Sequence, residues 1–135
     1  MLNKILVTGG CGFIGSNFLN RMDPRYKKTK FLNIDKLTYA GKIKNLQSIK
    51  RLKNYNFIKI DICNQIKLKK VIKKFNPQIV VHFAAESHVD NSIKNPRHFI
   101  ESNILGTYNI LKSINKKTFL IHISTDEVYG HVVKN

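Results

Sequence analysis

Two adjacent carboxylates, Asp126 and Glu127, stand in the segment STDEVYG, which runs from Ser124 to Gly130. Two carboxyl groups held close together can split their pKa values, so that one stays protonated while the other is ionised. That division suits a general acid working beside a general base. The same letters also fit a helix N-cap followed by an acidic first turn, so the residues alone leave both interpretations open.

A glycine-rich segment, TGGCGFIG, could bind phosphate. Gly10, Gly12 and Gly15 satisfy the spacing G-x-G-x-x-G at the junction between an apolar run and an amphipathic segment. An early glycine permits the tight turn, the second lets the backbone approach a pyrophosphate, and the third allows close packing of helix on strand. Backbone N–H groups at the start of the helix would then meet the phosphate charge. The alternative is a glycine-rich turn that only connects a strand to a helix.

Asp35 ends the next apolar run, 20 residues after Gly15. An acidic residue at this distance can accept hydrogen bonds from the adenosine ribose of a dinucleotide, and its charge would repel a 2′-phosphate. The pattern therefore favours NAD over NADP. Lys36 lies beside Asp35 and leaves that choice open.

Apolar runs alternate with amphipathic stretches along the chain, which predicts βαβ units and a parallel sheet. The predicted strands are residues 4–8, 31–35, 56–60, 78–85 and 118–124, and the predicted helices are residues 12–22, 42–50, 64–75 and 96–115. The expected fold class is α/β, a Rossmann-like doubly wound parallel sheet. A length of 135 residues suits one domain.

Side chains on these elements are expected to divide into an apolar and a solvated set. In the third helix Leu68, Ile72 and Phe75 share one face, and lysines line the remainder. The residues Ile100, Ile104, Tyr108 and Leu111 give the last helix an apolar face. We expect His82 and His122, each inside an apolar strand, to be core residues.

The chain is strongly basic, with 24 Lys and Arg against 8 Asp and Glu and a formal net charge of +16. Such a charge can attract nucleic acid. The excess residues, however, are Lys, Ile and Asn, all encoded by A/T-rich codons, and the lysines do not gather with aromatic residues into a binding motif. We therefore expect codon bias to be the cause, and no nucleic-acid partner.

Cys11 and Cys63 are far apart and lack metal-ligand spacing, so neither a metal site nor a disulfide framework is expected. No apolar run of about 18 residues is present, and the start of the chain lacks a signal-peptide core. The sequence predicts a cytoplasmic protein without a membrane partner.

Longer stretches carry a resemblance to a known family. Gly9, Gly12 and Gly15 resemble the TGxxGxxG turn of extended short-chain dehydrogenases/reductases. Three further stretches are similar to the dTDP-glucose 4,6-dehydratase family within that superfamily, in the same order and over the whole chain. These are IDKLTYAG (34–41), HFAAESHVDNSI (82–93) and HISTDEVYG (122–130).

The resemblance implies a set of cofactor-binding residues around NAD. They are Gly9, Gly12, Phe13, Ile14 and Gly15 in the turn; Asp35, Lys36, Leu37 and Thr38 at the adenosine ribose; Asp61 and Ile62 beside the adenine; Phe83, Ala84, Ala85 and Glu86 beneath the cofactor; and Ser102 from the last helix. Ser87 would contact the sugar nucleotide, dTDP-glucose.

The resemblance also implies a reaction, the conversion of dTDP-glucose into a 4-keto-6-deoxy sugar nucleotide. Members of the family oxidise the sugar at C4 with NAD, eliminate water across C5 and C6, and return the hydride to C6. Asp126 would be the acid and Glu127 the base of the elimination, with Thr125 hydrogen-bonded to the sugar near C4. The flanking HIS and VYG favour this catalytic interpretation over the helix cap.

The superfamily also uses a Tyr-x-x-x-Lys pair, and no such pair follows residues 118–124. Family members are more than twice as long, so the resemblance implies an incomplete NAD-binding domain over residues 1–135, truncated after about five strands and without the substrate domain. The expectation is an N-terminal fragment that is inactive alone and poorly soluble. A homodimer is typical of the family and doubtful for this chain.

Three alternatives stay open beside a dehydratase fragment whose remaining part is supplied by a separate polypeptide. The chain can be a catalytically dead NAD-binding remnant, part of an NAD-dependent sugar-nucleotide epimerase, or a basic nucleic-acid-binding module. An epimerase has no need for adjacent Asp126 and Glu127. The nucleic-acid module is the least favoured, because the lysines are scattered.

Overall fold

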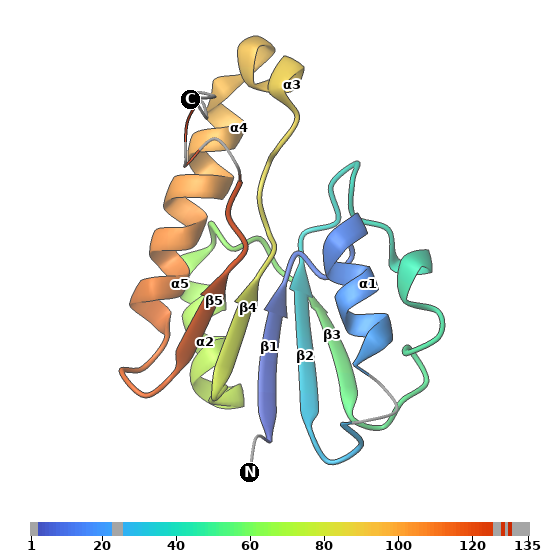
Figure 1. Cartoon of the computed structure of the whole chain (residues 1–135). Helices are drawn as coiled ribbons and strands as arrows, with labels where there is room; N and C mark the ends of the chain where they lie inside the picture. Colours follow the sequence, from blue (N-terminus) through green and yellow to red (C-terminus); the bar gives the residue numbers. More distant parts are fainter. Residues whose placement is uncertain (1–2, 23–25, 126–127, 129, 131–135) are drawn as a thin grey trace, which may run out of the picture.

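The computed structural model describes residues 3–22, 26–125, 128 and 130. In this part of the chain, five parallel strands form one sheet in the order β3-β2-β1-β4-β5 (Figure 1). The strands are β1 (Lys4–Thr8), β2 (Lys30–Asp35), β3 (Tyr55–Lys59), β4 (Ile79–His82) and β5 (Phe119–His122). The α/β fold class that the sequence predicts is confirmed.

Helices join the strands, and several lie end to end. They are α1 (Phe13–Arg21), the 3₁₀-helix η1 (Ile43–Leu46), α2 (Gln65–Phe75), α3 (Val89–Lys94), α4 (Pro96–Phe99), the π-helix η2 (Ile100–Gly106) and α5 (Thr107–Ser113). The last three run on without a break and are called the long helix below (Figure 1).

The carboxyl ends of the strands meet at one edge of the sheet. Thr8, the last residue of β1, is in register with Ile34 of β2 and His82 of β4, and His82 is in register with His122 of β5. The strand order reverses at β1, which has β2 on one side and β4 on the other. In open α/β sheets, ligands bind in the crevice outside the carboxyl ends at such a switch point.

Alternate strand residues build a core on each face of the sheet. Leu6 and Val80 pack with residues of α2 and α5, whereas Val7 and Val81 pack with Leu19 of α1 and with residues near η1. Figure 1 shows α2 behind the sheet, on the opposite side from α1. The period-2 alternation of strand side chains therefore produces the layered architecture.

Helix α2 follows the predicted pattern. Leu68 and Ile72 are buried in the core, and Asn64 caps the helix by accepting a hydrogen bond from the Lys67 backbone N–H at 3.1 Å. Asn76 ends it in the left-handed conformation, with φ of 50°. The lysines of this helix lie on its solvated side.

Three details differ from the sequence-based expectations. The segment 42–50 forms only the short 3₁₀-helix η1, and α3 appears where no helix was expected. His82 is buried, but His122 is exposed, so the expectation of a core residue was wrong there. His122 ends β5, which among the described residues pairs only with β4 and therefore lies at the edge of the sheet. Among the described residues, no helix has the length and apolar character needed to cross a bilayer.

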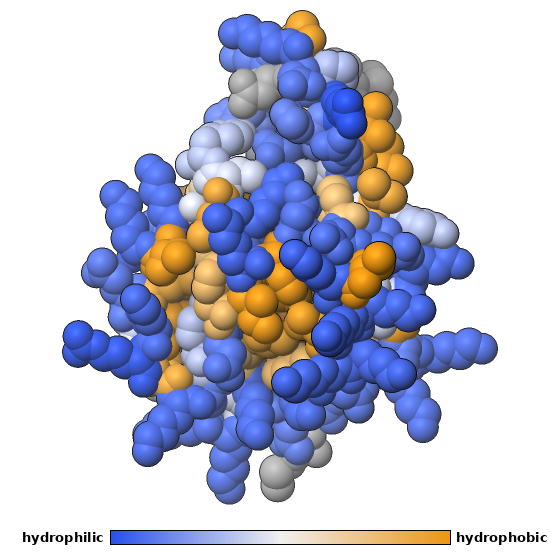
Figure 2. Space-filling view, turned by 180° about the vertical axis from the view of Figure 1, so that it is seen from behind, coloured by the Kyte–Doolittle hydropathy of each residue, from blue (hydrophilic) through white to orange (hydrophobic). Residues whose placement is uncertain are grey.

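The apolar face of the long helix points outward. Its residues are exposed by about half or more: Ile100 by 56%, Ile104 by 65%, Tyr108 by 50% and Leu111 by 53%. The buried side of the helix is formed instead by small and polar residues, among them Ser102, Gly106 and Asn109, together with Ile110. Seen from behind, apolar atoms mark the upper right of the molecule, where the long helix runs (Figure 2).

Candidate cofactor site

The glycine-rich turn after β1 is tightly packed. Gly9 has a φ of 71°, and a Cβ atom on it would lie 2.5 Å from the backbone N of Ala84. A Cβ on Gly15 would lie 2.5 Å from the Gly9 carbonyl oxygen, so both positions require glycine. The turn delivers the chain to α1, whose first residues, Phe13 and Ile14, are exposed. Helix α1 begins just after this turn, at the carboxyl edge of the sheet, and the N–H groups of its first turn point back toward that edge as in any α-helix.

Asn33, a buried residue in the middle of β2, holds the glycine-rich turn in place. Its Oδ1 accepts a hydrogen bond from the Gly10 N–H at 3.1 Å, and its Nδ2 donates to the Tyr55 hydroxyl at 3.0 Å. Burial raises the pKa of Tyr55 to about 12. Asn33 was not among the residues predicted from the sequence, although a lone amide inside the apolar run FLNID was a usable signal.

Asp35 ends β2 with its carboxylate turned toward the glycine-rich turn. Its Oδ2 accepts a hydrogen bond from the Cys11 N–H at 2.9 Å, and its Oδ1 accepts one from the Leu37 N–H at 2.8 Å. Leu37 has a φ of 61°, a left-handed conformation that costs energy for a leucine and wraps the chain around the carboxylate. Each carboxylate oxygen keeps a further lone pair for a ribose hydroxyl.

Cys11 behaves as a small buried residue of the turn, as expected from its sequence context. It is fully buried, and burial together with the Asp35 charge raises the pKa of its thiol to about 12. The thiolate is therefore absent at neutral pH. Cys63 is also a free cysteine, with a pKa raised to about 11 mainly by burial.

Lys36 contacts a different part of the site from Asp35. Its Nζ lies 3.6 Å from Oδ2 of Asp61 and donates a hydrogen bond to Oγ of Ser102 at 3.3 Å. Ser102 is buried in the π-helical segment of the long helix. Single π turns inside α-helices are frequent at functional sites.

The loop after β3 is fixed by the long helix. Asn109 donates hydrogen bonds through Nδ2 to the carbonyl oxygens of Ile62, at 3.0 Å, and Cys63, at 3.2 Å. Oδ1 of Asp61 accepts a hydrogen bond from the Cys63 N–H at 2.9 Å. Asp61 and Ile62 are thereby held opposite Ser102.

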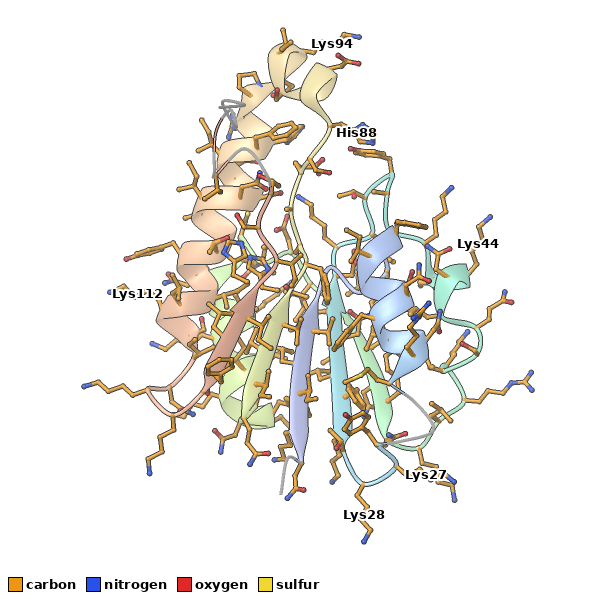
Figure 3. The ribbon with its side chains drawn as sticks, in the orientation of Figure 1. Lys27, Lys28, Lys44, His88, Lys94 and Lys112 are labelled. Atoms are coloured by element: carbon orange, nitrogen blue, oxygen red, sulfur yellow. The ribbon has the colours of Figure 1, made fainter. Side chains whose placement is uncertain are left out.

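The loop after β4 is fixed in the same way. Asn103 accepts a hydrogen bond from the Glu86 N–H at 2.8 Å and donates one to the Glu86 carbonyl at 2.9 Å. The Glu86 carboxylate in turn accepts a hydrogen bond from the Tyr39 hydroxyl at 3.2 Å. The ring of Tyr39 lies 5.9 Å from that of His88, which Figure 3 shows at the gap between α3 and the loop after β2.

A cavity of about 90 Å³ lies between these loops. It adjoins a larger one of about 370 Å³, with which it shares Lys36, Thr38 and Glu86. Most of the residues assigned to the cofactor from the sequence line the smaller cavity: Gly9, Gly12, Asp35, Lys36, Thr38, Ile62, Phe83, Ala84, Ala85, Glu86 and Ser102.

Other predicted residues lie around this cavity without lining it. Gly15 packs beneath the turn, Leu37 packs against the core, and Asp61 contacts Lys36. Phe13 and Ile14 extend from the start of α1. The geometry therefore gathers one candidate site, and the role of each residue in it stays a prediction.

The predicted catalytic residues lie beyond β5. Thr125 is partly buried, and its carbonyl accepts a hydrogen bond from the Val128 N–H at 3.4 Å. Asp126 and Glu127 lie outside the described residues. Ser87, the predicted substrate contact, is exposed in the loop after β4.

His82 joins three elements directly under the site. Its ring nitrogens contact Oγ1 of Thr8 at 2.7 Å and Oγ1 of Thr107 at 3.0 Å, and its ring stacks on His122 with centroids 4.9 Å apart. Burial, with a smaller contribution from His122, lowers the pKa of His82 to about 4. His82 is therefore neutral at pH 7, and its hydrogen bonds tie β1 and β4 to the long helix.

The lysines labelled in Figure 3 extend into solvent from separate parts of the molecule. Lys27 and Lys28 precede β2, Lys44 belongs to η1, Lys94 ends α3, and Lys112 belongs to α5. Their spread agrees with the scatter of lysines along the sequence. The expectation that no nucleic acid binds stays a prediction.

Comparisons with known proteins give a consistent picture of what this chain is similar to. The family model described as GDP-mannose 4,6 dehydratase matches residues 6–135. The dTDP-glucose 4,6-dehydratase of Salmonella typhimurium is 44% identical over 138 residues, which cover 94% of this chain and 38% of that protein. The chain thus spans about two fifths of the length of the curated relatives it matches.

Solved structures extend the similarity to three dimensions. The dTDP-glucose 4,6-dehydratase of Streptomyces venezuelae, solved with NAD bound, matches with a TM-score of 0.86 and 36% identity over 98% of this chain and 42% of its own. The UDP-glucose 4-epimerase of Thermotoga maritima, solved with UDP-glucose, matches with a TM-score of 0.83 and 30% identity over 98% of this chain and 41% of its own.

Proposed function

This chain belongs to the GDP-mannose 4,6-dehydratase family, and from that premise we propose that it is the NAD-binding part of a dTDP-glucose 4,6-dehydratase. The relatives named dTDP-glucose 4,6-dehydratase support the substrate. The Streptomyces venezuelae relative, solved with NAD, supports the cofactor. The epimerase neighbours are compatible with the same domain but do not favour an epimerase.

The observation that carries the cofactor proposal is the convergence of three loops on the switch point of the sheet. A glycine with positive φ lets the turn after β1 pack against the loop after β4, and the Asp35 carboxylate at the end of β2 binds the other side of that turn. A Cβ atom at Gly9 would close this approach. The residues present therefore fit a dinucleotide.

Each part of the cofactor has a group to hold it. The N–H groups at the start of α1 would bind the pyrophosphate beside Gly12. Asp35 would accept hydrogen bonds from the adenosine ribose, and Ile62 would pack on the adenine beside Asp61. Phe83 and Ala84 would support the cofactor from the loop after β4.

The chemistry would come from residues after β4 and after β5. NAD, when bound, would accept a hydride from C4 of the sugar and return it to C6. Thr125 would hydrogen-bond the sugar near C4, and Ser87 would contact the sugar nucleotide. Asp126 would protonate the departing C6 hydroxyl while Glu127 removes the C5 proton, which is acidified by the ketone at C4.

The oxidation at C4 needs a base, and among the described residues no Tyr-x-x-x-Lys pair lines the site. The sequence contains the spacing Tyr-x-x-x-Lys three times, at Tyr26–Lys30, Tyr55–Lys59 and Tyr108–Lys112, all before β5. Lys112 lies over the ring of Tyr108 on the outer side of the long helix, 5.6 Å from its centroid. We therefore expect the base to correspond to a residue in the part of the relatives that this chain does not match.

A chimaera tests the activity. Residues 1–135 are joined to the part of the Salmonella typhimurium relative that this chain does not match, and dTDP-glucose turnover is measured by the appearance of the 4-keto-6-deoxy product. We expect turnover, and a loss of about 10²-fold or more in Asp126→Asn and in Glu127→Gln, which is typical for general acid–base groups. A folded chimaera that binds NAD and forms no product would contradict the proposed activity.

A further inference from the structure

Lys36 raises a question that the sequence leaves open. A cation just after β2 is the kind of residue that accommodates the 2′-phosphate of NADP, while an acidic residue at the end of β2 selects NAD. This chain has both residues side by side, Asp35 and Lys36. The preference between the two cofactors therefore depends on where the ammonium group of Lys36 lies.

The two side chains have different neighbours. The Asp35 carboxylate accepts hydrogen bonds from the N–H groups of Cys11 and Leu37, at 2.9 and 2.8 Å, and faces the glycine-rich turn. The Lys36 ammonium is instead 3.6 Å from Oδ2 of Asp61 and 3.3 Å from Oγ of Ser102. The Lys36 ammonium is therefore held toward the loop after β3 and the long helix. It lies away from the Asp35 carboxylate, which would bind the ribose hydroxyls.

Both partners of Lys36 are fixed by their own surroundings. Asp61 is fixed by the N–H of Cys63 at 2.9 Å, and the following loop is bonded to Asn109 of the long helix. Ser102 is 5% exposed, on a π-helical turn. Neither partner can follow Lys36 toward the ribose without breaking these contacts.

We propose that Asp61 and Ser102 determine the cofactor preference by holding Lys36 away from the position that a 2′-phosphate would occupy. With Lys36 held there, a 2′-phosphate meets the Asp35 charge without a compensating cation and is repelled. Release of Lys36 would supply a compensating cation, because its flexible four-carbon stem can turn back toward Asp35. This inference rests on the proposed function, since it requires the cavity to bind a dinucleotide.

The inference predicts which substitutions shift the preference. Asp61→Asn keeps the size and the acceptor oxygen of the side chain but removes the charge that attracts Lys36. Ser102→Ala removes the second partner without any change in charge. We expect the NADP to NAD affinity ratio to rise about fivefold in Asp61→Asn, since partly exposed charge pairs are weak, and by a smaller factor in Ser102→Ala.

The effect should depend on Lys36, and a double-mutant cycle tests that dependence. Calorimetric titrations with NAD and NADP are made on the unaltered chain, on Asp61→Asn and Ser102→Ala, and on each of these combined with Lys36→Met. The rise in the ratio should vanish in the Lys36→Met background. Glu86→Gln removes a carboxylate that lines the same cavity but forms no ion pair with Lys36 among the described residues. It therefore measures the loss of a nearby negative charge and should raise the ratio less than Asp61→Asn.

The outcomes separate this inference from the proposed function. If the unaltered chain binds NAD but neither Asp61→Asn nor Ser102→Ala raises the ratio, the inference is overturned and the proposed function stands. The inference is likewise overturned if the rise persists in the Lys36→Met background, or if Glu86→Gln equals Asp61→Asn. If the folded chain binds neither dinucleotide, the proposed function fails and the inference fails with it.

Discussion

Strands β1 and β5 have the same apolar character in sequence, KILVT against FLIH, but very different surroundings. Ile5, Leu6 and Val7 are at most 2% exposed, whereas Phe119 is 65% and Ile121 is 38% exposed. Strand β1 has a neighbour on both sides and helices on both faces. Among the described residues β5 pairs only with β4 and packs only Leu120 into a core. An apolar strand is buried by its neighbours and not by its composition.

Exposed apolar residues are also found beside β5 and after its end. The exposed Ile121 and Ile123 line an apolar groove with Ile79, Val81 and Phe18, and the long helix presents its apolar face on the other side of the sheet. Apolar patches of this kind and unpaired strand edges are common places for association. The loops around Gly9 and Asp35 are by contrast fixed by side-chain hydrogen bonds from Asn33 and from the long helix.

The largest expected difference between β1 and β5 is the stability that is lost when an apolar side chain of each strand is truncated. Leu6→Ala should lower the free energy of unfolding by about 2–5 kcal/mol, because it leaves a cavity in a closed core. The matched substitution Ile121→Ala should cost less than about 1 kcal/mol, since water already reaches that side chain. Urea denaturation followed by circular dichroism measures both. Equal costs would show that β5 is as well covered as β1.

Acid should lower the stability of the fold through His82, whose hydrogen bonds tie β1 and β4 to the long helix. The pKa of His82 is lowered from 6.5 to about 4, so between these values the unfolded chain binds the proton and the folded chain does not. Stability is therefore fully present above pH 6.5 and is lost as the pH falls. The expected loss is about 3 kcal/mol between pH 7 and pH 4.

Urea denaturation at several pH values checks this prediction. His82→Gln should flatten the pH dependence in this window. A chain whose stability does not differ between pH 7 and pH 4, or an unflattened profile in His82→Gln, would rule out the assigned role.

The smallest expected effect on stability comes from lysine substitutions at the exposed edge strand β5 and just after it. Ile121→Lys combined with Ile123→Lys should change the free energy of unfolding by about 0.5 kcal/mol or less per site, since exposed substitutions away from a packed core are nearly neutral. Solubility should rise clearly, because lysine on an edge strand opposes pairing with other chains. Light scattering after gel filtration measures it. An unaltered chain that is already monodisperse would refute the expected aggregation.

The sequence was most informative where a pattern is local. The strand positions, the glycine-rich turn and Asp35 follow from residue types and spacing, because hydrophobic periodicity and glycine geometry act over a few residues. The outward apolar face of the long helix did not follow, since its periodicity alone does not say which face meets the sheet. The exposure of His122 likewise depends on what covers β5.

Contacts between distant segments were the other limit. Asn33, Asn103 and Asn109 hold three loops of the site through side-chain hydrogen bonds to backbone groups 17 to 47 residues away. No spacing rule links such partners. The position of Lys36 against Asp61 and Ser102 is of the same kind, because it arises only when β2, β3 and the long helix meet.

The central claim is that the cavity lined by Gly9 and Asp35, at the carboxyl edge of the sheet, binds NAD. Calorimetric titration of NAD into the folded chain, paired with thermal unfolding, tests it most directly. A ligand that binds only the folded state stabilises it by about 2.7 kcal/mol at 100 times its Kd. We predict saturable binding with a raised Tm, both lost in Asp35→Ala and retained in Ile121→Ala. A chain that is folded by circular dichroism and shows neither signal at millimolar NAD would contradict the claim.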